Sequence, residues 1–290
     1  MSELILQSLY SGTLVGGIYA LIALGLSLSF GTMRIINLAH GELVLLAAYV
    51  AYTVESRFGV NPILALPLAL AVVCSCSAIV YFLIGRIKRN RELNSLMLTF
   101  ALGVILTNAV LLLWKSDIHS TASTSMQKAI QVGNLYSMFS ELLFFVLSLL
   151  VALVLGWWLS RSWYGRAVRA VSSNRDAAKL MGINPAKVEL VSFLVAGVLA
   201  TIAGIAIFST GVISPPLGHS LTVKAFIITV LAGVGSVPGV ILAAFLLGIT
   251  ESLTVTLFSS ALQELAGMVL FLIVLFIMPN GLFGAKARRG

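Results

Sequence analysis

Long, continuously apolar stretches separated by short polar segments dominate the chain. Seven of these stretches approach the roughly 20 residues that an α-helix needs to cross a membrane. They lack the alternating apolar and polar positions of a membrane β-barrel. We therefore predict an all-α, polytopic membrane helix bundle. The seven predicted spans cover residues 8–30, 62–85, 94–114, 138–159, 188–211, 238–257 and 264–279.

Two shorter apolar stretches, 43–54 and 223–234, are too brief for a straight crossing. Irregular backbone at membrane depth must be shielded from lipid, so we expect broken or re-entrant helices packed against protein there. The bundle then has about eight to nine membrane segments. Residues 1–290 are predicted to form a single transmembrane domain that carries one polar loop at 161–189.

The composition agrees with a chain that is surrounded by lipid. Hydrophobic residues make up 59% of the sequence and charged residues 10%, against about 25% charged residues in soluble domains. The net charge of +8 is therefore interpreted as a topology signal and not as a sign of nucleic-acid binding. Cys74 and Cys76 point to different sides of one predicted helix, so we expect neither a disulfide nor a metal site. The first residues lack the basic segment of a cleavable signal peptide.

Basic residues gather in three segments: the loop after residue 85, the insert 161–189 and the tail. These segments hold 13 of the 18 lysines and arginines, and such segments face the cytosol in membrane proteins. The connections 115–137 and 212–222 are then external, and Glu3 and Arg34 favour an external N-terminus. The basic residues are Arg86, Lys88, Arg89, Arg91, Arg161, Arg166, Arg169, Arg175, Lys179, Lys187, Lys286, Arg288 and Arg289.

The insert 161–189 contains a short helix with its own start and stop signals. Ser173 and Asp176 have the spacing of a capping box. Gly182 offers a left-handed stop, and Pro185 cannot continue the helix.

This short helix is predicted to be amphipathic. Ala177, Leu180 and Met181 fall on one face at i, i+3 and i+4, while Arg175 and Lys179 stay in water. A capped amphipathic helix in an aqueous loop suits docking to a partner protein. The alternative is a helix that lies on the lipid surface.

The polar residues Arg34, Asn37, His40 and Glu42 cluster between the first span and the apolar stretch that follows it, with Gly41 among them. Polar residues at membrane depth are rare and commonly functional. One interpretation is a broken helix, allowed by Gly31 and Gly41, whose polar groups line a transport cavity. The other is a cytosolic hairpin in which His40 and Glu42 face water.

Two further charged residues lie within predicted spans. Glu251, in the middle of a span, lines a pathway or bonds neighbouring serine and threonine side chains. Lys224 lies near a span end and is expected to extend its amine toward the membrane surface.

The sequence contains no phosphate-binding G-x-x-x-x-G-K-[ST] loop, no H-E-x-x-H or G-x-S-x-G motif and no cluster of metal ligands. We therefore expect a protein that is not an enzyme and holds no cofactor or metal of its own.

Three stretches resemble a known family: GGIYALIALGLSLSFGTMRIINLAHGE, AGVGSVPGVILAAFLLGITESL and MPNGLFG. They are similar to the LivH-type inner-membrane permease subunits of bacterial branched-chain amino acid ABC importers, and the resemblance extends over essentially the whole chain. Such permeases carry an E-A-A-x-x-x-G signature in a cytosolic loop. Asp176, Ala177, Ala178 and Gly182 match it, with Asp in place of Glu and without the I-x-L-P that often follows.

The resemblance implies that the insert helix docks into a groove of an ATPase subunit, with Leu180 and Met181 as buried contacts. A periplasmic binding protein then delivers leucine, isoleucine or valine. This chain and a second, LivM-like permease enclose the pathway, and two ATP-binding cassette subunits hold the ATP and drive alternating access.

Other classes of transporter stay open at this point. A secondary transporter needs ion-coupling carboxylates at midplane, where Glu251 is the one candidate. A channel needs rings of polar residues, which the spans lack. Within the ABC class, related permeases carry urea or short amides.

Overall fold

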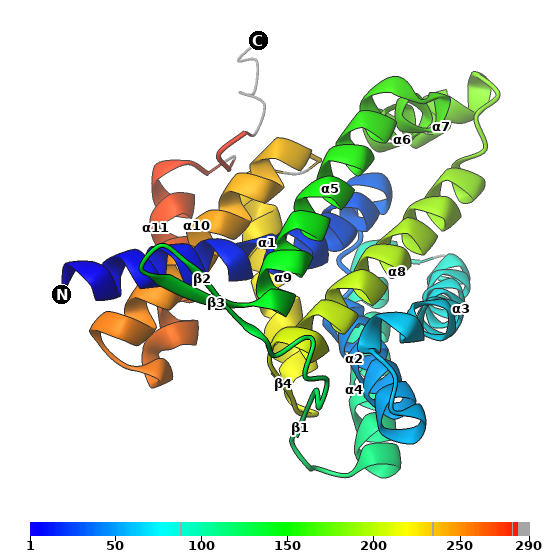
Figure 1. Ribbon diagram of the computed structural model, residues 1–290. Helices are drawn as coiled ribbons and strands as arrows, with labels where there is room; N and C mark the ends of the chain where they lie inside the picture. Colours follow the sequence, from blue (N-terminus) through cyan, green and yellow to red (C-terminus); the bar gives the residue numbers. More distant parts are fainter. Residues whose placement is uncertain (88, 234, 280, 284–290) are drawn as a thin grey trace.

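The computed structural model describes residues 1–87, 89–233, 235–279 and 281–283. Lys88 and the tail residues Lys286, Arg288 and Arg289, which contribute to the predicted topology, lie outside the described residues. The described residues form a helix bundle with two small antiparallel sheets (Figure 1). The predicted all-α membrane bundle is confirmed.

Seven helical segments within the described residues are long and apolar enough to cross a membrane, and they correspond to the seven predicted spans. The helices are α1 (Ser2–Met33), α2 (His40–Phe58), η1 (Pro62–Ala65), α3 (Leu66–Gly85), α4 (Arg91–Trp114), α5 (Phe139–Arg161), α6 (Trp163–Ser173), α7 (Arg175–Leu180), α8 (Pro185–Thr210), α9 (Leu217–Ala232), α10 (Val237–Leu257), η2 (Ser260–Leu262) and α11 (Gln263–Ile277). The strands are β1 (His119–Ser120), which pairs with β4 (Val212–Ile213), and β2 (Ala129–Val132), which pairs with β3 (Leu135–Met138).

The two short apolar stretches are continuous helices and not broken ones. α2 has 19 residues and α9 has 16, because polar residues outside each apolar stretch are also helical. The break lies before α2, at residues 34–39, and it begins where Arg34 adopts a left-handed conformation with φ 56°. Gly31 and Gly41, the predicted break points, lie inside α1 and α2.

Side chains from neighbouring helices satisfy the irregular backbone between α1 and α2. The Leu38 amide donates to Thr99 Oγ1 of α4 at 3.2 Å, and the Leu38 carbonyl accepts from Thr222 Oγ1 of α9 at 3.3 Å. Asn37 Oδ1 accepts from the Ala39 amide at 3.1 Å. The segment therefore meets the requirement that backbone polar groups at membrane depth be bonded within the protein.

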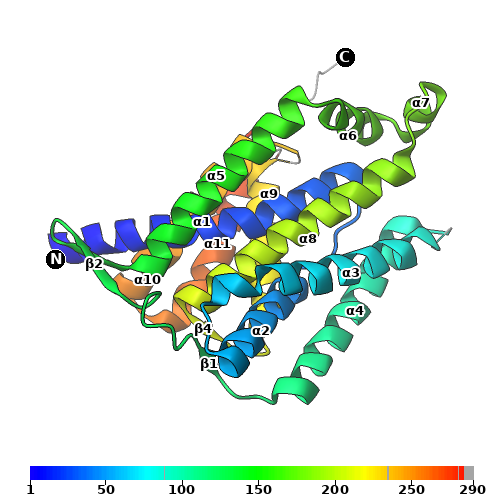
Figure 2. The same cartoon turned by 45° about the vertical axis from the view of Figure 1, so that its right-hand side comes forward.

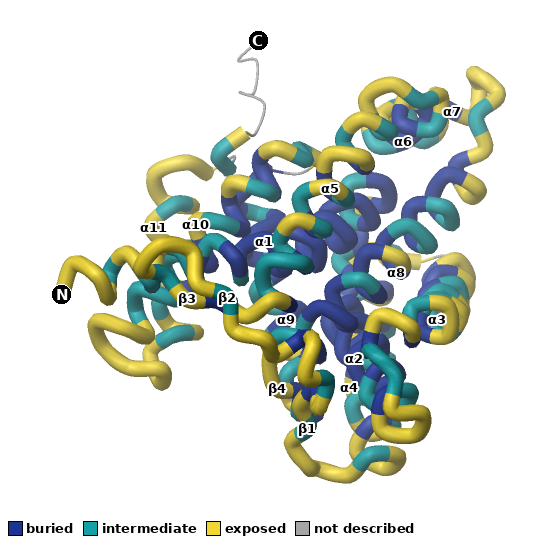
Figure 3. The backbone as a smooth tube through the Cα atoms, in the orientation of Figure 1, coloured by how far each residue is buried: buried dark blue, intermediate teal, exposed yellow. Residues whose placement is uncertain are grey.

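α1 lies at the centre of the bundle, where residues 16–29 are buried without interruption (Figure 3). Small residues allow this close packing. A Cβ atom at Gly12 would lie 2.7 Å from the Ile249 Cα of α10, and one at Gly204 of α8 would lie 2.6 Å from the Ala47 Cβ of α2. α1 therefore packs on α10, and α8 packs on α2, at distances that larger residues would prevent.

Segments far apart in the sequence meet at the two ends of the bundle (Figure 2). At one end, Gln7 Nε2 donates to the Tyr136 carbonyl at 2.7 Å, and β1 pairs with β4. We call this the hairpin end. At the other end, Arg34 Nη2 donates to the Ser172 carbonyl at 3.1 Å, and we call it the insert end. The N-terminus, 115–137 and 212–213 thus share one end, as predicted, and the charge pattern predicts that the insert end faces the cytosol.

The predicted external loop 115–137 is folded onto the helices. The His119 ring stacks on Tyr52 of α2 with centroids 3.9 Å apart. Buried Glu55 accepts hydrogen bonds from Thr121 Oγ1 at 2.6 Å and from the Ala122 amide at 3.2 Å. With these contacts, the loop covers the end of α2 that lies at the hairpin end of the bundle.

Candidate functional site

The insert forms two helices, α6 and α7, before α8 begins. Asn174 caps α7, because its Oδ1 accepts from the amides of Asp176 at 3.1 Å and Ala177 at 3.0 Å. The predicted capping box of Ser173 and Asp176 is wrong: Ser173 ends α6, and the Asp176 carboxylate pairs with Lys179 at 3.0 Å. Asparagine caps helices as well as serine does, so the start of the helix moves by one residue.

The predicted stop signals lie where the structure changes direction. Gly182 is left-handed, with φ 79°, as predicted. Pro185 is the first residue of α8, and the Asn184 side chain caps that helix by accepting from the Lys187 amide at 3.3 Å. α7 is thus a single capped turn and a half between two longer helices.

The apolar side chains at the end of α7 point away from the bundle. Leu180 is 89% exposed and Met181 is 82% exposed. Ala177 is exposed as well, whereas Ala178 is buried against the core. Large apolar side chains this exposed, at the polar end of a membrane protein, mark a surface that a partner or lipid covers.

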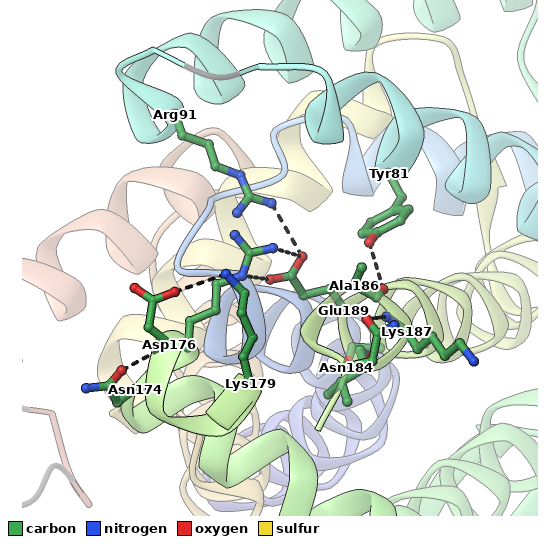
Figure 4. Close-up of polar contacts among 12 residues, drawn as sticks. Tyr81, Arg91, Asn174, Asp176, Lys179, Asn184, Ala186, Lys187 and Glu189 are labelled. Atoms are coloured by element: carbon green, nitrogen blue, oxygen red, sulfur yellow. Dashed lines mark hydrogen bonds and ion pairs between the residues drawn. The ribbon is translucent and has the colours of Figure 1, made fainter. Parts of the chain in front are cut away.

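The Arg175 side chain is 41% exposed, so it stays partly in water as predicted, and it also pairs with Glu189 of α8, which Figure 4 labels. Glu189 is 1% exposed. Its Oε1 lies 2.9 Å from Arg175 Nε, and its Oε2 lies 3.1 Å from Arg175 Nη2 and 3.4 Å from Arg91 Nη2 of α4. One buried carboxylate therefore joins α7, α8 and α4. The two contacts from the Nη2 atoms are charge-assisted hydrogen bonds, which are the stronger class of hydrogen bond.

Tyrosines hold the start of α8 from two further sides. Tyr81 Oη of α3 donates to the Ala186 carbonyl at 2.7 Å (Figure 4), and Tyr164 Oη of α6 donates to the Val188 carbonyl. Burial raises the pKa of Tyr164, which keeps the phenol protonated as a donor. We call the cluster of Glu189 with Arg175 and Arg91 the ionic base of α7. This cluster was not predicted from the sequence, although a glutamate in the second turn of an apolar helix was a signal for it.

The polar residues before and within α2 are buried. Asn37 and His40 are 2% and 1% exposed. His40 Nε2 lies 3.0 Å from the Ile22 carbonyl, and the Gly41 amide donates to Thr222 Oγ1 at 2.9 Å. The interpretation as a water-facing hairpin is therefore wrong, because helices α1 and α9 cover these residues.

Glu42 alone of the predicted pathway residues lines an open groove. The groove has a volume of about 430 Å³ and lies between α2, α4 and α9. Phe100, Val104, Val223 and Phe226 supply apolar walls, and Asn108 and His219 supply polar groups.

Glu251 takes part in a separate buried network. Its Oε2 accepts from Lys224 Nζ at 2.7 Å, from Tyr19 Oη at 2.8 Å and from Gln263 Nε2 at 2.9 Å. The predicted serine and threonine partners are wrong, and so is the extension of Lys224 toward the membrane surface. The network joins α1, α9, α10 and α11 and satisfies the carboxylate within the protein.

Residues 8–278 match the family described as "Branched-chain amino acid transport system / permease component". The chain is 30% identical to the high-affinity branched-chain amino acid transport system permease protein BraD of Pseudomonas aeruginosa, over 96% of this chain and 95% of that one. It is 28% identical to LivH of Escherichia coli K12 over the same shares. The probable permease LivH of Methanocaldococcus jannaschii is 30% identical, over 97% of this chain and 91% of that one.

No solved structure matches this chain. The sequence resemblance is nevertheless confirmed, because the family match covers nearly all the helices described above. The chain belongs to the permease components of branched-chain amino acid transport systems and is a multi-pass protein of the inner membrane.

Proposed function

We propose that this chain is one permease subunit of an ATP-driven importer of branched-chain amino acids. The observation that carries the proposal is the α7 tip, a capped helix with exposed Leu180 and Met181 on a rigid ionic base. Such a tip suits insertion into an apolar groove of an ATPase. The names of the similar permeases support the substrate.

The ionic base offers a route from the tip to the groove. Arg175 begins α7 and Arg91 begins α4, and both bind Glu189. α4 also supplies Phe100 and Val104 to the groove wall. A displacement of α7 by the ATPase is thus passed through Glu189 to a helix that borders the groove, as rigid-body motion of packed elements requires.

The groove is proposed to be part of the translocation pathway. Its α4 wall is open, with Phe100 54% and Val104 46% exposed. A second, LivM-like permease packed on this face would close it into a cavity between two subunits. Asn37, His40 and Gly41 then support the groove from behind through their bonds to α1 and α9.

The remaining proposed partners bind at the two ends of the bundle. Two ATP-binding cassette subunits bind the insert ends of the two permeases and hold the ATP, so this chain carries no cofactor and performs no catalysis. A periplasmic binding protein delivers the amino acid to the hairpin end, where the folded segment 115–137 offers an ordered surface.

The test is uptake of radiolabelled leucine into vesicles that contain this chain, its second permease, the ATPases and the binding protein. We expect uptake that requires ATP and persists when a protonophore removes the proton gradient. Uptake that needs the gradient and not ATP would indicate a secondary transporter. Competition by urea or acetamide, with none by isoleucine or valine, would indicate an amide permease.

A further inference from the structure

Glu42 brings to the groove a carboxyl group with one of its two oxygens unpaired among the described residues. The residue is 5% exposed, and its Oε2 is buried with no hydrogen-bond donor among the described residues. A buried carboxylate without a donor is costly, and buried charges are normally paired. The arrangement indicates a site for a cationic group.

The first turn of a neighbouring helix lies beside this carboxyl group. Both Glu42 oxygens lie against Gly218, where a Cβ atom would be 2.8 Å from Oε1. Gly218 is the second residue of α9, whose first turn has no side-chain cap. The carboxylate thus lies at the positive end of the helix dipole. The cation on the same helix, Lys224, pairs with Glu251 instead.

The walls around Glu42 suit a small aliphatic ligand. Phe100, Val104, Val223 and Phe226 form apolar surfaces on α4 and α9. The volume of about 430 Å³ lies within the roughly 300–1,000 Å³ of typical small-molecule sites. One fixed anion beside an apolar wall is complementary to an ammonium group that carries an aliphatic side chain.

We propose that Glu42 binds the α-ammonium group of the transported amino acid while the walls of α4 and α9 contact its side chain. The inference rests on the proposed function and assigns the charge selectivity of the groove to one residue. The pairing is transient, because a bound amino acid must also leave.

The first test compares Glu42→Gln and Glu42→Asp with the wild type in the reconstituted importer. We expect Glu42→Gln to lower the maximal rate of leucine uptake about tenfold or more, as for loss of a charged hydrogen bond, and Glu42→Asp to retain more uptake. ATPase stimulation by the loaded binding protein should persist. Glu264→Gln, the same change at an exposed carboxylate of α11 outside the groove, is the control and should leave uptake within about twofold of the wild type.

The second test separates ligand contact from a structural role. A hydrophobic carbodiimide should label Glu42 in the purified complex, as measured by mass spectrometry of its peptide. Leucine should protect Glu42, whereas 4-methylpentanoate, which has the same aliphatic chain without the ammonium group, should not.

The outcomes distinguish the two proposals. Equal protection by both compounds, or by neither, would overturn the ammonium site, as would full uptake by Glu42→Gln. Failure of the wild-type importer to take up leucine in the presence of ATP would instead overturn the proposed function.

Discussion

Arg175 and Glu189 form an ion pair across the turn between α7 and α8, with Nε and Oε1 2.9 Å apart. The carboxylate is almost fully buried, and Arg91 of α4 binds it from the other side at 3.4 Å. α7 therefore cannot shift alone without leaving a buried carboxylate short of partners. A displacement of the exposed tip of α7 must therefore also displace α8 and α4.

Glu189→Gln should weaken this base. Each charged hydrogen bond contributes about 1.5–3 kcal/mol, so we expect the thermal unfolding temperature to fall by several degrees and ATP-dependent uptake to fall more than basal ATPase activity. Lys179→Gln, which removes the exposed pair with Asp176, is the control, since such surface pairs contribute about 0–1 kcal/mol. Equal effects of the two changes would contradict the role of Glu189.

Leu180→Asp or Met181→Asp should abolish transport, because a charge would enter an apolar contact at a cost of several kcal/mol. Both side chains are exposed in this chain, so the permease itself should insert and accumulate normally. The measurement is co-purification of the ATPases. Lys187→Asp, an exposed change beside α7, should leave co-purification intact. ATPases that still bind the Leu180 and Met181 variants would exclude docking at this tip.

The parts of the fold that depend on continuous hydrophobicity could be predicted from the sequence. All seven long spans and the polar insert are where the pattern placed them. α2 and α9 were underestimated, because hydropathy counts His40 and Glu42 at the start of α2, and His219 at the start of α9, as unfavourable. In the structure, neighbouring helices surround His40 and Glu42.

The site was predictable only in part for a similar reason. The left-handed conformation of Gly182 and the exposed tip of α7 could be predicted, because they depend on residues that are close in sequence. The partners of Glu189 and Glu251 come from helices distant in sequence, as Arg91 and Lys224 do. A single sequence does not show which distant residues are in contact, so these pairs could not be predicted.

Removing one charge of the Lys224–Glu251 pair should destabilise the protein more than replacing both residues. Glu251→Gln alone leaves Lys224 buried without its counter-charge, and losing one partner of a buried pair costs about 3–5 kcal/mol. We expect a large fall in the unfolding temperature. The double change Lys224→Met with Glu251→Gln should recover most of that loss. A double variant as unstable as the single one would show that the charges are not coupled.

Cysteine labelling should establish the orientation of the two ends. In a chain whose Cys74 and Cys76 are replaced by serine, Ser173→Cys should react with a membrane-impermeant maleimide only from the cytosolic side. Thr124→Cys should react only from outside. Both positions are exposed, so access depends on sidedness. Reversed labelling would invert the charge-based topology and remove α7 from reach of an ATPase.

Gly41 is required for close packing and not for a left-handed backbone. It lies in α2 and is not among the positive-φ glycines of the described residues. A Cβ atom there would lie 2.6 Å from the Thr222 amide nitrogen of α9, a backbone atom that cannot move alone. Gly41→Ala should therefore destabilise the protein by about 1–3 kcal/mol, as overpacking does.

Gly31→Ala is the matched control for Gly41→Ala. Its new Cβ atom would meet its nearest neighbour, the Gly235 Cα, at 3.8 Å, an ordinary contact distance. Gly31 also lies within α1, where alanine is the better helix former. We expect the unfolding temperature of Gly31→Ala to equal or exceed that of the wild type, while Gly41→Ala falls by several degrees and loses uptake. A stable, active Gly41→Ala would mean that α2 and α9 separate enough in the assembled transporter to admit a methyl group.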